Sequence, residues 1–266
     1  MTSSRTPLSW LSDPDWSTLS HAYGPAEDVP ELLRGLLSDS HATREAALDG
    51  LWGVLHHQGD VYDSTVAAVP YLIAVVQEPR TQDRAKILEV LESLARMPGD
   101  FDPSSVRDLY KNFPKFIATD EYLATRLRDA ERMHGHRVAA STAIQRHSKV
   151  FLELVRGAPL LVAVSAFNVS MRLGTHGAAR ELALRLERET KTDARRVAIE
   201  ALAKHFCEPD AQNALESVLV HDPSAENRLI AQLSLDSENA QARRIALLER
   251  VYYHAGSQQP RKTEEQ

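Results

Sequence analysis

One stretch of 27 residues recurs in this chain 40 positions further on, and this repetition limits the possible folds more than any other feature of the sequence. Residues 29–55 align without a gap to residues 69–95. The matching pairs are Pro30 and Pro70, Leu32 and Leu72, Leu33 and Ile73, Arg44 and Arg84, Leu48 and Leu88, and Leu51 and Leu91. A shorter form of the pattern follows Arg195, and a degenerate form follows Arg228. Self-similarity at such a period predicts stacked copies of one structural unit.

Each copy has the pattern of two helices joined by a polar turn. In the first copy, apolar residues recur with the spacing of one helix face at positions 47, 48, 51, 54 and 55. Asp28 stands before Val29 and Pro30, which is typical of a helix N-cap followed by proline in the first turn. Pro70 lies further inside its helical pattern, so we expect a kink or a later helix start there.

Beyond residue 96 the pattern changes. Residues 97–116 contain three prolines, which predicts an extended connection with short helical turns. A charged helical pattern then leads to helices near 143–156 and 159–173, and the second is apolar around most of its circumference, which predicts a central, buried helix. Two further hairpins are expected at about 177–206 and 210–235, and a last helix at about 238–254.

The sequence therefore favours a single all-α domain over residues 1–256. We divide it into an N-terminal cap (1–28), two clear repeats (29–96), an irregular insertion (97–142) and further repeats (143–254), followed by a polar tail (257–266) that we expect to be disordered. In the cap, four apolar residues are expected to cover the open end of the first repeat: Trp10, Leu11, Trp16 and Leu19.

The repeat pattern resembles that of a known class of helical proteins. The Pro-x-Leu-Leu start of the first helix, the polar turn and the Arg-x-x-Ala start of the second helix are similar to HEAT-like repeats of the armadillo-type α-solenoid class. The resemblance covers residues 29–96 well and 143–235 more loosely. The stretches "WSTLSHAYGPAEDVP" and "LWGVLHHQGDVYDST" also resemble a small group of bacterial HEAT-repeat proteins of no agreed activity. The resemblance implies a right-handed α-α superhelix of about five to six helical hairpins with an irregular central insertion, and a binding role without assigned catalytic residues.

Cysteine content and charge restrict where the protein works and what it binds. Cys207 is the only cysteine, which excludes an internal disulfide and favours a reducing compartment. Neither a signal-peptide pattern nor a run of about 18 apolar residues occurs, so we expect a cytoplasmic protein without a membrane span. Residues 1–100 carry 7 Lys and Arg against 15 Asp and Glu (−8), residues 101–200 carry 17 against 12 (+5), and residues 201–266 carry 7 against 10 (−3). Because the acidic front third repels phosphate, nucleic acid is an unfavoured partner, and a cationic protein or peptide is a favoured one.

The segment between the two clear copies concentrates polar side chains: His56, His57, Asp60, Tyr62 and Asp63. A structural interpretation explains most of them, because Gly59 suits a left-handed helix end and Asp63 or Ser64 can cap the next helix. Alternatively, these residues form the rim of a binding surface, since inter-repeat turns lie along one edge of a solenoid. A third interpretation is a catalytic dyad in which His57 is the base and Asp60 or Asp63 orients it.

The arginines fall into two groups. Four of them occupy one position per copy, which favours structural pairing with an acid or a carbonyl over a phosphate-binding array: Arg44, Arg84, Arg195 and Arg228. Arg126 and Arg137 lie outside the repeat positions and are candidates for a partner-binding patch, with a solvated helix face as the alternative.

Motifs that carry chemistry are scarce. His134 and His136 stand two residues apart, and on a helix such side chains point in different directions unless the helix breaks at Gly135, so we expect no metal site. Cys207 lacks the neighbouring groups that would organise it as a nucleophile. The sequence has no Gly-rich phosphate loop, GxSxG, HExxH or paired CxxC motif, and we expect no cofactor.

These features predict a non-catalytic scaffold that binds a protein or peptide through the concave face or the inter-repeat turns of a HEAT-like solenoid. The alternative is an enzyme on the same scaffold, with His57, Asp60 and Asp63 as its polar site. Its activity would be base excision like that of HEAT-like DNA glycosylases, or modification of a small molecule or peptide. The tryptophans lie in the acidic front third rather than in the basic middle, which counts against a glycosylase. The sequence sets no expectation for the oligomeric state.

Overall fold

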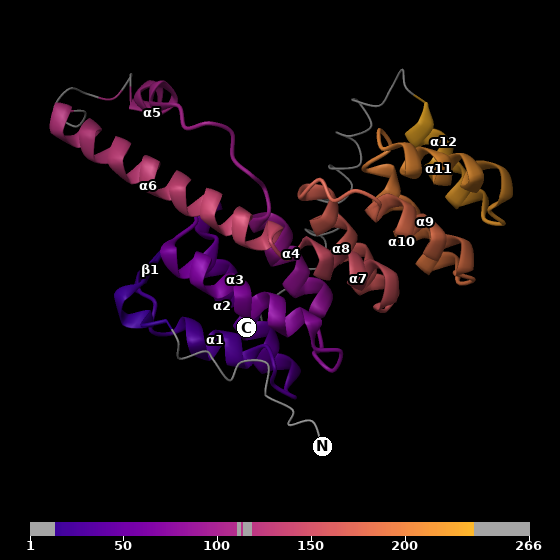
Figure 1. Ribbon diagram of the computed structural model, residues 1–266, viewed down its shortest axis with the longest axis horizontal. Helices are drawn as coiled ribbons and strands as arrows, with labels where there is room; N and C mark the ends of the chain where they lie inside the picture. The colour runs from indigo at the N-terminus through magenta and orange to yellow at the C-terminus, as the bar shows by residue number, and fades with distance from the viewer. Residues whose placement is uncertain (1–13, 111–112, 114–118, 237–266) are drawn as a thin grey trace, which may run out of the picture. The chain divides into compact units, whose positions relative to one another are not determined.

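The computed structural model describes residues 14–110, 113 and 119–236, and in these ranges the chain is mostly helical (Figure 1). The all-α prediction is therefore confirmed, with one two-stranded hairpin as a small addition. The chain divides into two compact units, residues 1–178 and 179–266. The predictions for Trp10, Leu11, the helix at 238–254 and the tail lie outside the described residues. The superhelix and the single domain over 1–256 stay predictions.

The first unit contains two helical hairpins that correspond to the two sequence copies. Its N-terminal part consists of a 3₁₀ turn η1 (Trp16–Thr18), strands β1 (Ser20–His21) and β2 (Gly24–Pro25), and helices α1 (Val29–Gly35) and α2 (His41–Leu55). A second 3₁₀ turn η2 (His57–Gly59) leads to helices α3 (Asp63–Gln77) and α4 (Arg84–Leu94). Helix α1 packs on α2 and α3 on α4, and the two hairpins contact each other through α1 with α3 and α2 with α4.

The remaining helices of the first unit are α5 (Pro103–Tyr110), α6 (Asp120–Gln145), α7 (Ser148–Gly157) and α8 (Leu160–Arg172). Helix α6 lies against α3, and α8 packs between α4 and α7. Most residues of α8 are buried, as its apolar circumference predicted. The second unit holds α9 (Ala178–Arg188), α10 (Thr192–Ala203), α11 (Pro209–His221) and α12 (Ala225–Leu235). Within the described residues, no helix combines the length and the hydropathy needed to cross a membrane.

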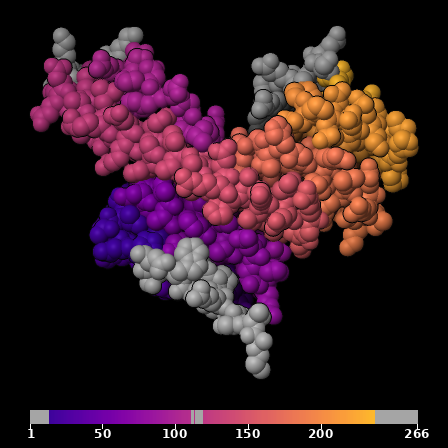
Figure 2. Space-filling model, viewed as in Figure 1, coloured from indigo at the N-terminus to yellow at the C-terminus, as the bar shows by residue number. Residues whose placement is uncertain are grey.

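The segment expected to be an irregular insertion contains two helices. Helix α5 occupies eight residues of the proline-containing stretch, and α6 runs for 26 residues, through Gly135 and beyond residue 142. Helix α5 lies along the N-terminal part of α6 (Figure 2), where the rings of Tyr110 and Tyr122 are 5.6 Å apart. The buried residues of α6 are confined to its C-terminal part, at Ala140, Ser141 and Ile144, where it meets the repeat core.

Helix α3 begins earlier than the position of Pro70 suggested. It starts at Asp63 and contains Pro70 in its interior, so the later start is wrong, and the alternative, a kink at Pro70, stays a prediction. The reason lies at its first turn, where Thr65 Oγ1 accepts a hydrogen bond from the backbone N–H of Tyr62 (3.0 Å) and donates to the carbonyl of Leu55 (2.7 Å). This threonine ties the start of α3 to the end of α2, which offsets the hydrogen bond that a proline removes.

Asp28 also behaves differently from the sequence expectation. It occupies the N-cap position of α1, but its side chain makes no capping hydrogen bond. Its carboxylate lies 2.9 Å from Nε2 of the buried His21 instead. The carboxylate of Asp28 thus contacts His21 of the β-hairpin, which the sequence did not predict, and does not cap α1. Trp16 of the expected cap is buried and packs on Tyr71 of α3, with ring centroids 5.9 Å apart.

Two of the repeat arginines join neighbouring hairpins. Arg44 donates from Nε to Asp83, which precedes α4 (2.7 Å), and from Nη1 to the carbonyls of Ser38 and Asp39. Arg195 repeats this geometry in the second unit: it donates from Nε to Asp222 (2.8 Å) and from Nη1 to the carbonyls of Leu186 and Glu189. Each arginine therefore links the end of one helix to the acidic turn before the last helix of the next hairpin.

Among the described residues, the other two repeat arginines bind backbone carbonyls and no carboxylate. Arg84 donates to the carbonyl of Val76 (3.4 Å), and Arg228 donates to the carbonyls of Asp222 and Pro223. The turn before α8 has the sequence Gly-Ala-Pro at 157–159, so it offers no acid to Arg84. The prediction of a structural role for these arginines is confirmed, and pairing with an acid holds for two of the four.

Candidate functional site

The turn between α2 and α3 reverses the chain through two residues with positive φ. Gln58 has a φ of 51° and Gly59 a φ of 90°. Glycine adopts this region without strain, and its occurrence here agrees with the left-handed conformation expected at Gly59. The turn brings His57, Asp60 and Tyr62 to the surface in one short segment, each of them partly exposed.

The β-hairpin places an exposed aromatic side chain against this turn. Tyr23 stands at the tip between β1 and β2, and 68% of its surface is exposed. Its hydroxyl lies 3.0 Å from Nδ1 of His57, and the two rings meet edge to face with centroids 5.1 Å apart. Tyr23 was not among the site residues predicted from the sequence. The signal that could have pointed to Tyr23 is its place in one of the two stretches that resemble bacterial HEAT-repeat proteins. The histidine-rich turn lies in the other stretch.

Asp63 holds the hairpin in place. Its Oδ1 accepts hydrogen bonds from the backbone N–H of Ser20 (2.8 Å), from the hydroxyl of Ser20 (3.2 Å) and from the N–H of Ser64 (2.8 Å). Strand β1 consequently lies beside α3 (Figure 1). Asp63 was predicted to contact a partner, to cap α3 or to orient His57, and in the structure its carboxylate positions the hairpin that carries Tyr23.

Of the two candidate arginines, one reaches the turn. Arg137 of α6 donates a hydrogen bond to the carbonyl of Gly59. Arg126 lies eleven residues earlier, about 16 Å away along the helix axis. It pairs with Asp129 at 3.0 Å and stands over the ring of Tyr122, beside α5. The structure thus brings Arg137 together with the turn residues and leaves Arg126 apart from them.

Two groups of the turn have shifted pKa values. Burial, and then the charge of Arg137, lower the pKa of His56, although Asp60 acts in the opposite direction. His56 is therefore neutral at neutral pH and packs on Trp52, with centroids 5.9 Å apart. Burial raises the pKa of Tyr62, and the nearby Asp60 and Tyr23 raise it further. The hydroxyl of Tyr62 therefore stays protonated at neutral pH.

Asp60 differs from the other turn carboxylate. It is half-buried, and no hydrogen bond or ion pair to it occurs among the residues that the structure describes. Arg137, the cation that reaches the turn, binds the Gly59 carbonyl. The surrounding segment 14–63 has an excess of negative charge, because it carries nine Asp and Glu against two Arg. One of these two, Arg44, is buried and paired with Asp83. Asp60 is thus a carboxylate without a direct partner in the described residues, two positions before Tyr62.

The catalytic and metal interpretations find little support in the geometry. Nδ1 of His57 faces the hydroxyl of Tyr23, and in the described part of the chain no ion pair joins His57 to Asp60 or Asp63. The described residues contain no group of three or more His, Cys, Asp or Glu side chains that could hold a metal ion. Because α6 is continuous, His134 and His136 point in different directions, and His134 packs on Phe101.

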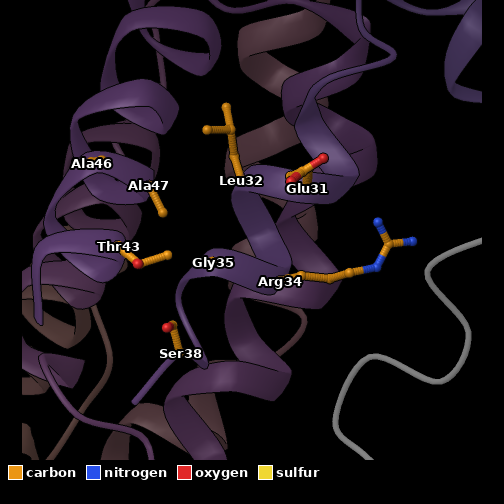
Figure 3. A pocket seen from close by; sticks show the side chains of 8 residues that line it. All are labelled: Glu31, Leu32, Arg34, Gly35, Ser38, Thr43, Ala46 and Ala47. Carbon is orange, nitrogen blue, oxygen red and sulfur yellow. The ribbon is translucent and has the colours of Figure 1, made fainter. Parts of the chain in front are cut away.

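A hollow of about 550 Å³ lies elsewhere, between α1 and α2 (Figure 3). It is lined by Glu31, Leu32, Arg34, Gly35, Ser38, Thr43, Ala46 and Ala47. Figure 3 shows that the side chain of Arg34 extends away from the hollow. A Cβ on Gly35 would stand 2.8 Å from that of Ala47, so the small side chains serve close contact between the two helices. The hollow is a feature of helix packing and carries no convergent polar groups.

Six of the seven predicted site residues lie at the turn or reach it: His56, His57, Asp60, Tyr62, Asp63 and Arg137. No family model matches the chain, and searches of curated proteins and of solved structures found no match either. We define the Tyr23–Asp60 surface as Tyr23, His57, Asp60 and Tyr62. It combines aromatic rings, tyrosine hydroxyls and a carboxylate without a direct partner among the described residues.

Proposed function

We propose that this protein is a non-catalytic scaffold that binds a protein or peptide through the Tyr23–Asp60 surface. The observation that carries the proposal is the placement of Tyr23, a mostly exposed aromatic residue held on His57 beside an unpaired carboxylate. Aromatic residues with a polar end are enriched at protein interfaces, because they bury much surface while fixing few rotatable bonds. The side chains that hold the hairpin, chiefly Asp63, make this surface rigid before a partner arrives.

The scaffold itself, in this proposal, is a HEAT-like α-solenoid with a right-handed superhelical course. The paired hairpins α1–α2 and α3–α4 support it, together with the recurring arginine contacts of Arg44 and Arg195. In repeat proteins, turns between successive hairpins gather along one edge and are free to vary for recognition. We further propose that the protein works in the cytoplasm, which suits a chain with a single cysteine.

No observation in the described part of the chain favours the enzymatic alternative. Acid–base catalysis by His57 would need a group that orients its ring for proton transfer, and the tyrosine hydroxyl at Nδ1 does not supply the negative charge that a carboxylate would. A base-excision activity would need a cationic surface, whereas the elements around the turn are acidic.

Site-specific photo-crosslinking tests the proposed function. Ala22 neighbours Tyr23 at the hairpin tip, so replacing Ala22 with p-benzoyl-phenylalanine places the reactive group beside the surface and leaves Tyr23 intact. Irradiation in a lysate of the native cells should give a discrete cross-linked product, and that product should be lost when Tyr23→Ala is added.

Val220 provides the matched control position. It lies on α11 in the second unit and is 71% exposed, similar to Tyr23. The same cross-linker at Val220 should not give the product seen at Ala22. Absence of a product at Ala22, or the same products at both positions, would argue against binding at this surface.

A further inference from the structure

We infer that the Tyr23–Asp60 surface takes a lysine or arginine side chain from its partner, with Asp60 as the counter-ion and the rings of Tyr23 and Tyr62 beside it. This inference rests on the proposed function and specifies the chemistry of the bound group. The partner is a polypeptide segment that presents a cationic side chain at its surface.

The state of Asp60 is the first argument. The other partly buried carboxylates of residues 14–83 each have a donor: Asp63 accepts from Ser20, Glu78 from Arg80 and Asp83 from Arg44. Asp60 is half-buried without such a donor in the described residues. A carboxylate that has lost part of its hydration gains most from a charge-assisted hydrogen bond, and an ammonium or guanidinium group supplies it.

The aromatic neighbours are the second argument. The edge-to-face contact with His57 fixes the ring of Tyr23 and leaves most of its surface open. Tyr62 follows Asp60 by two residues, and Asp60 and Tyr23 both raise the pKa of its hydroxyl. The face of a tyrosine ring attracts a cation, and the alkyl stem of lysine or arginine packs on it.

The surrounding charge is the third argument. Segment 14–63 carries nine carboxylates against two arginines, so its field attracts cations and repels phosphate and carboxylate groups. Arg137 reaches the turn but donates to the carbonyl of Gly59. Charge complementarity therefore favours a basic segment over an acidic or nucleic-acid partner.

Fluorescence anisotropy with defined peptides tests this inference on the full chain. The probe is a labelled 12-residue peptide of alternating lysine and glycine, compared with the same peptide acetylated at every lysine and with its arginine counterpart. At least one cationic peptide should bind and the acetylated one should not. Asp60→Asn should weaken binding roughly tenfold or more, because it removes the counter-ion and preserves the shape.

Asp49→Asn is the matched control, because Asp49 is an exposed carboxylate on α2 and its loss changes the net charge by the same amount. It should weaken binding about twofold or less, as expected for a screened, distant charge. Three results would overturn the inference: equal losses in the two variants, equal binding of the acetylated peptide, or no binding of either cationic peptide. If one of these results is obtained and the Ala22 cross-linked product still forms, only the inference of a cationic ligand is refuted. If the Ala22 product is also absent, the proposed function is refuted as well.

Discussion

At the scale of single residues, the buried arginines show how one position can be repeated for structure rather than for function. Arg44 is 4% exposed and satisfies a carboxylate and two carbonyls at once. Arg84 occupies the equivalent position with a single carbonyl contact. The sequence predicted the recurrence because periodicity is local information. It did not identify Asp83 as the partner of Arg44, since that choice depends on how two hairpins stack.

We expect Arg44→Met to lower the free energy of unfolding by about 3–5 kcal/mol, because it leaves Asp83 without its cation and frees two carbonyls. Arg84→Met should cost about 1–2 kcal/mol, because it removes one long hydrogen bond. Urea denaturation monitored by circular dichroism measures both values. Arg34→Met, at an exposed site on α1, should have little effect. An equal loss at positions 44 and 84 would contradict the proposed importance of the carboxylate.

The same ion pair predicts a pH dependence. The hydrogen bond from Arg44 lowers the pKa of Asp83 below its usual value. Since the folded-state pKa is the lower one, the pair stabilises the fold above the unfolded-state pKa of an aspartate, near 4, and this stabilisation is lost as the pH falls further through the folded-state pKa. Asp83→Asn should be less stable than the wild type at pH 7, and the difference should shrink in acid. A difference that stays constant from pH 7 to pH 3 would show that Asp83 does not stabilise through its charge.

At the scale of secondary-structure elements, the spacing of apolar residues predicted which segments are helical. The capping and proline signals were a poorer guide to where those helices begin. The apolar spacing identified α2, α4 and α8, whereas Pro70 suggested a start for α3 that Thr65 overrides. Asp28 was expected to cap α1, but its carboxylate contacts His21 of the β-hairpin. A two-residue strand carries too little pattern to be predicted, so Tyr23 was missed as a site residue. The turn residues could be predicted because they cluster in the sequence. Arg137 could be proposed because it lies outside the arginine positions that recur with the repeat.

The role of Asp63 as the anchor of the hairpin gives a prediction for the element. Asp63→Ala should speed hydrogen exchange at the amide of Ser20 by about 10- to 100-fold, because a hydrogen bond to a charged acceptor is lost. Amide-resolved exchange measured by NMR reports this directly. Asp49→Ala should leave the Ser20 rate unchanged. If Ser20 exchanges equally fast in the wild type and in Asp63→Ala, the hairpin is held by other contacts, such as Trp16 on Tyr71.

At the scale of the whole molecule, the repeat explains how a helical chain can hold a turn at a defined place on its surface. Stacked hairpins bury a continuous core inside the first unit, with Leu51, Leu72 and Leu91 among its fully buried residues. The stacking leaves the inter-hairpin turn at the surface, where a small β-hairpin adds a second tyrosine, Tyr23, to the Tyr62 of the turn. The sequence could predict the helical class from its period, whereas the Tyr23–Asp60 surface depends on contacts between segments some 35 residues apart.

The most direct test of the central claim is the yield of the Ala22 cross-linked product in three backgrounds: the otherwise unchanged protein, Tyr23→Ala and Asp49→Asn. The proposed binding role predicts that the product disappears in Tyr23→Ala and persists in Asp49→Asn, with all three proteins equally folded by circular dichroism. A yield that is the same in all three backgrounds would contradict recognition through the Tyr23–Asp60 surface.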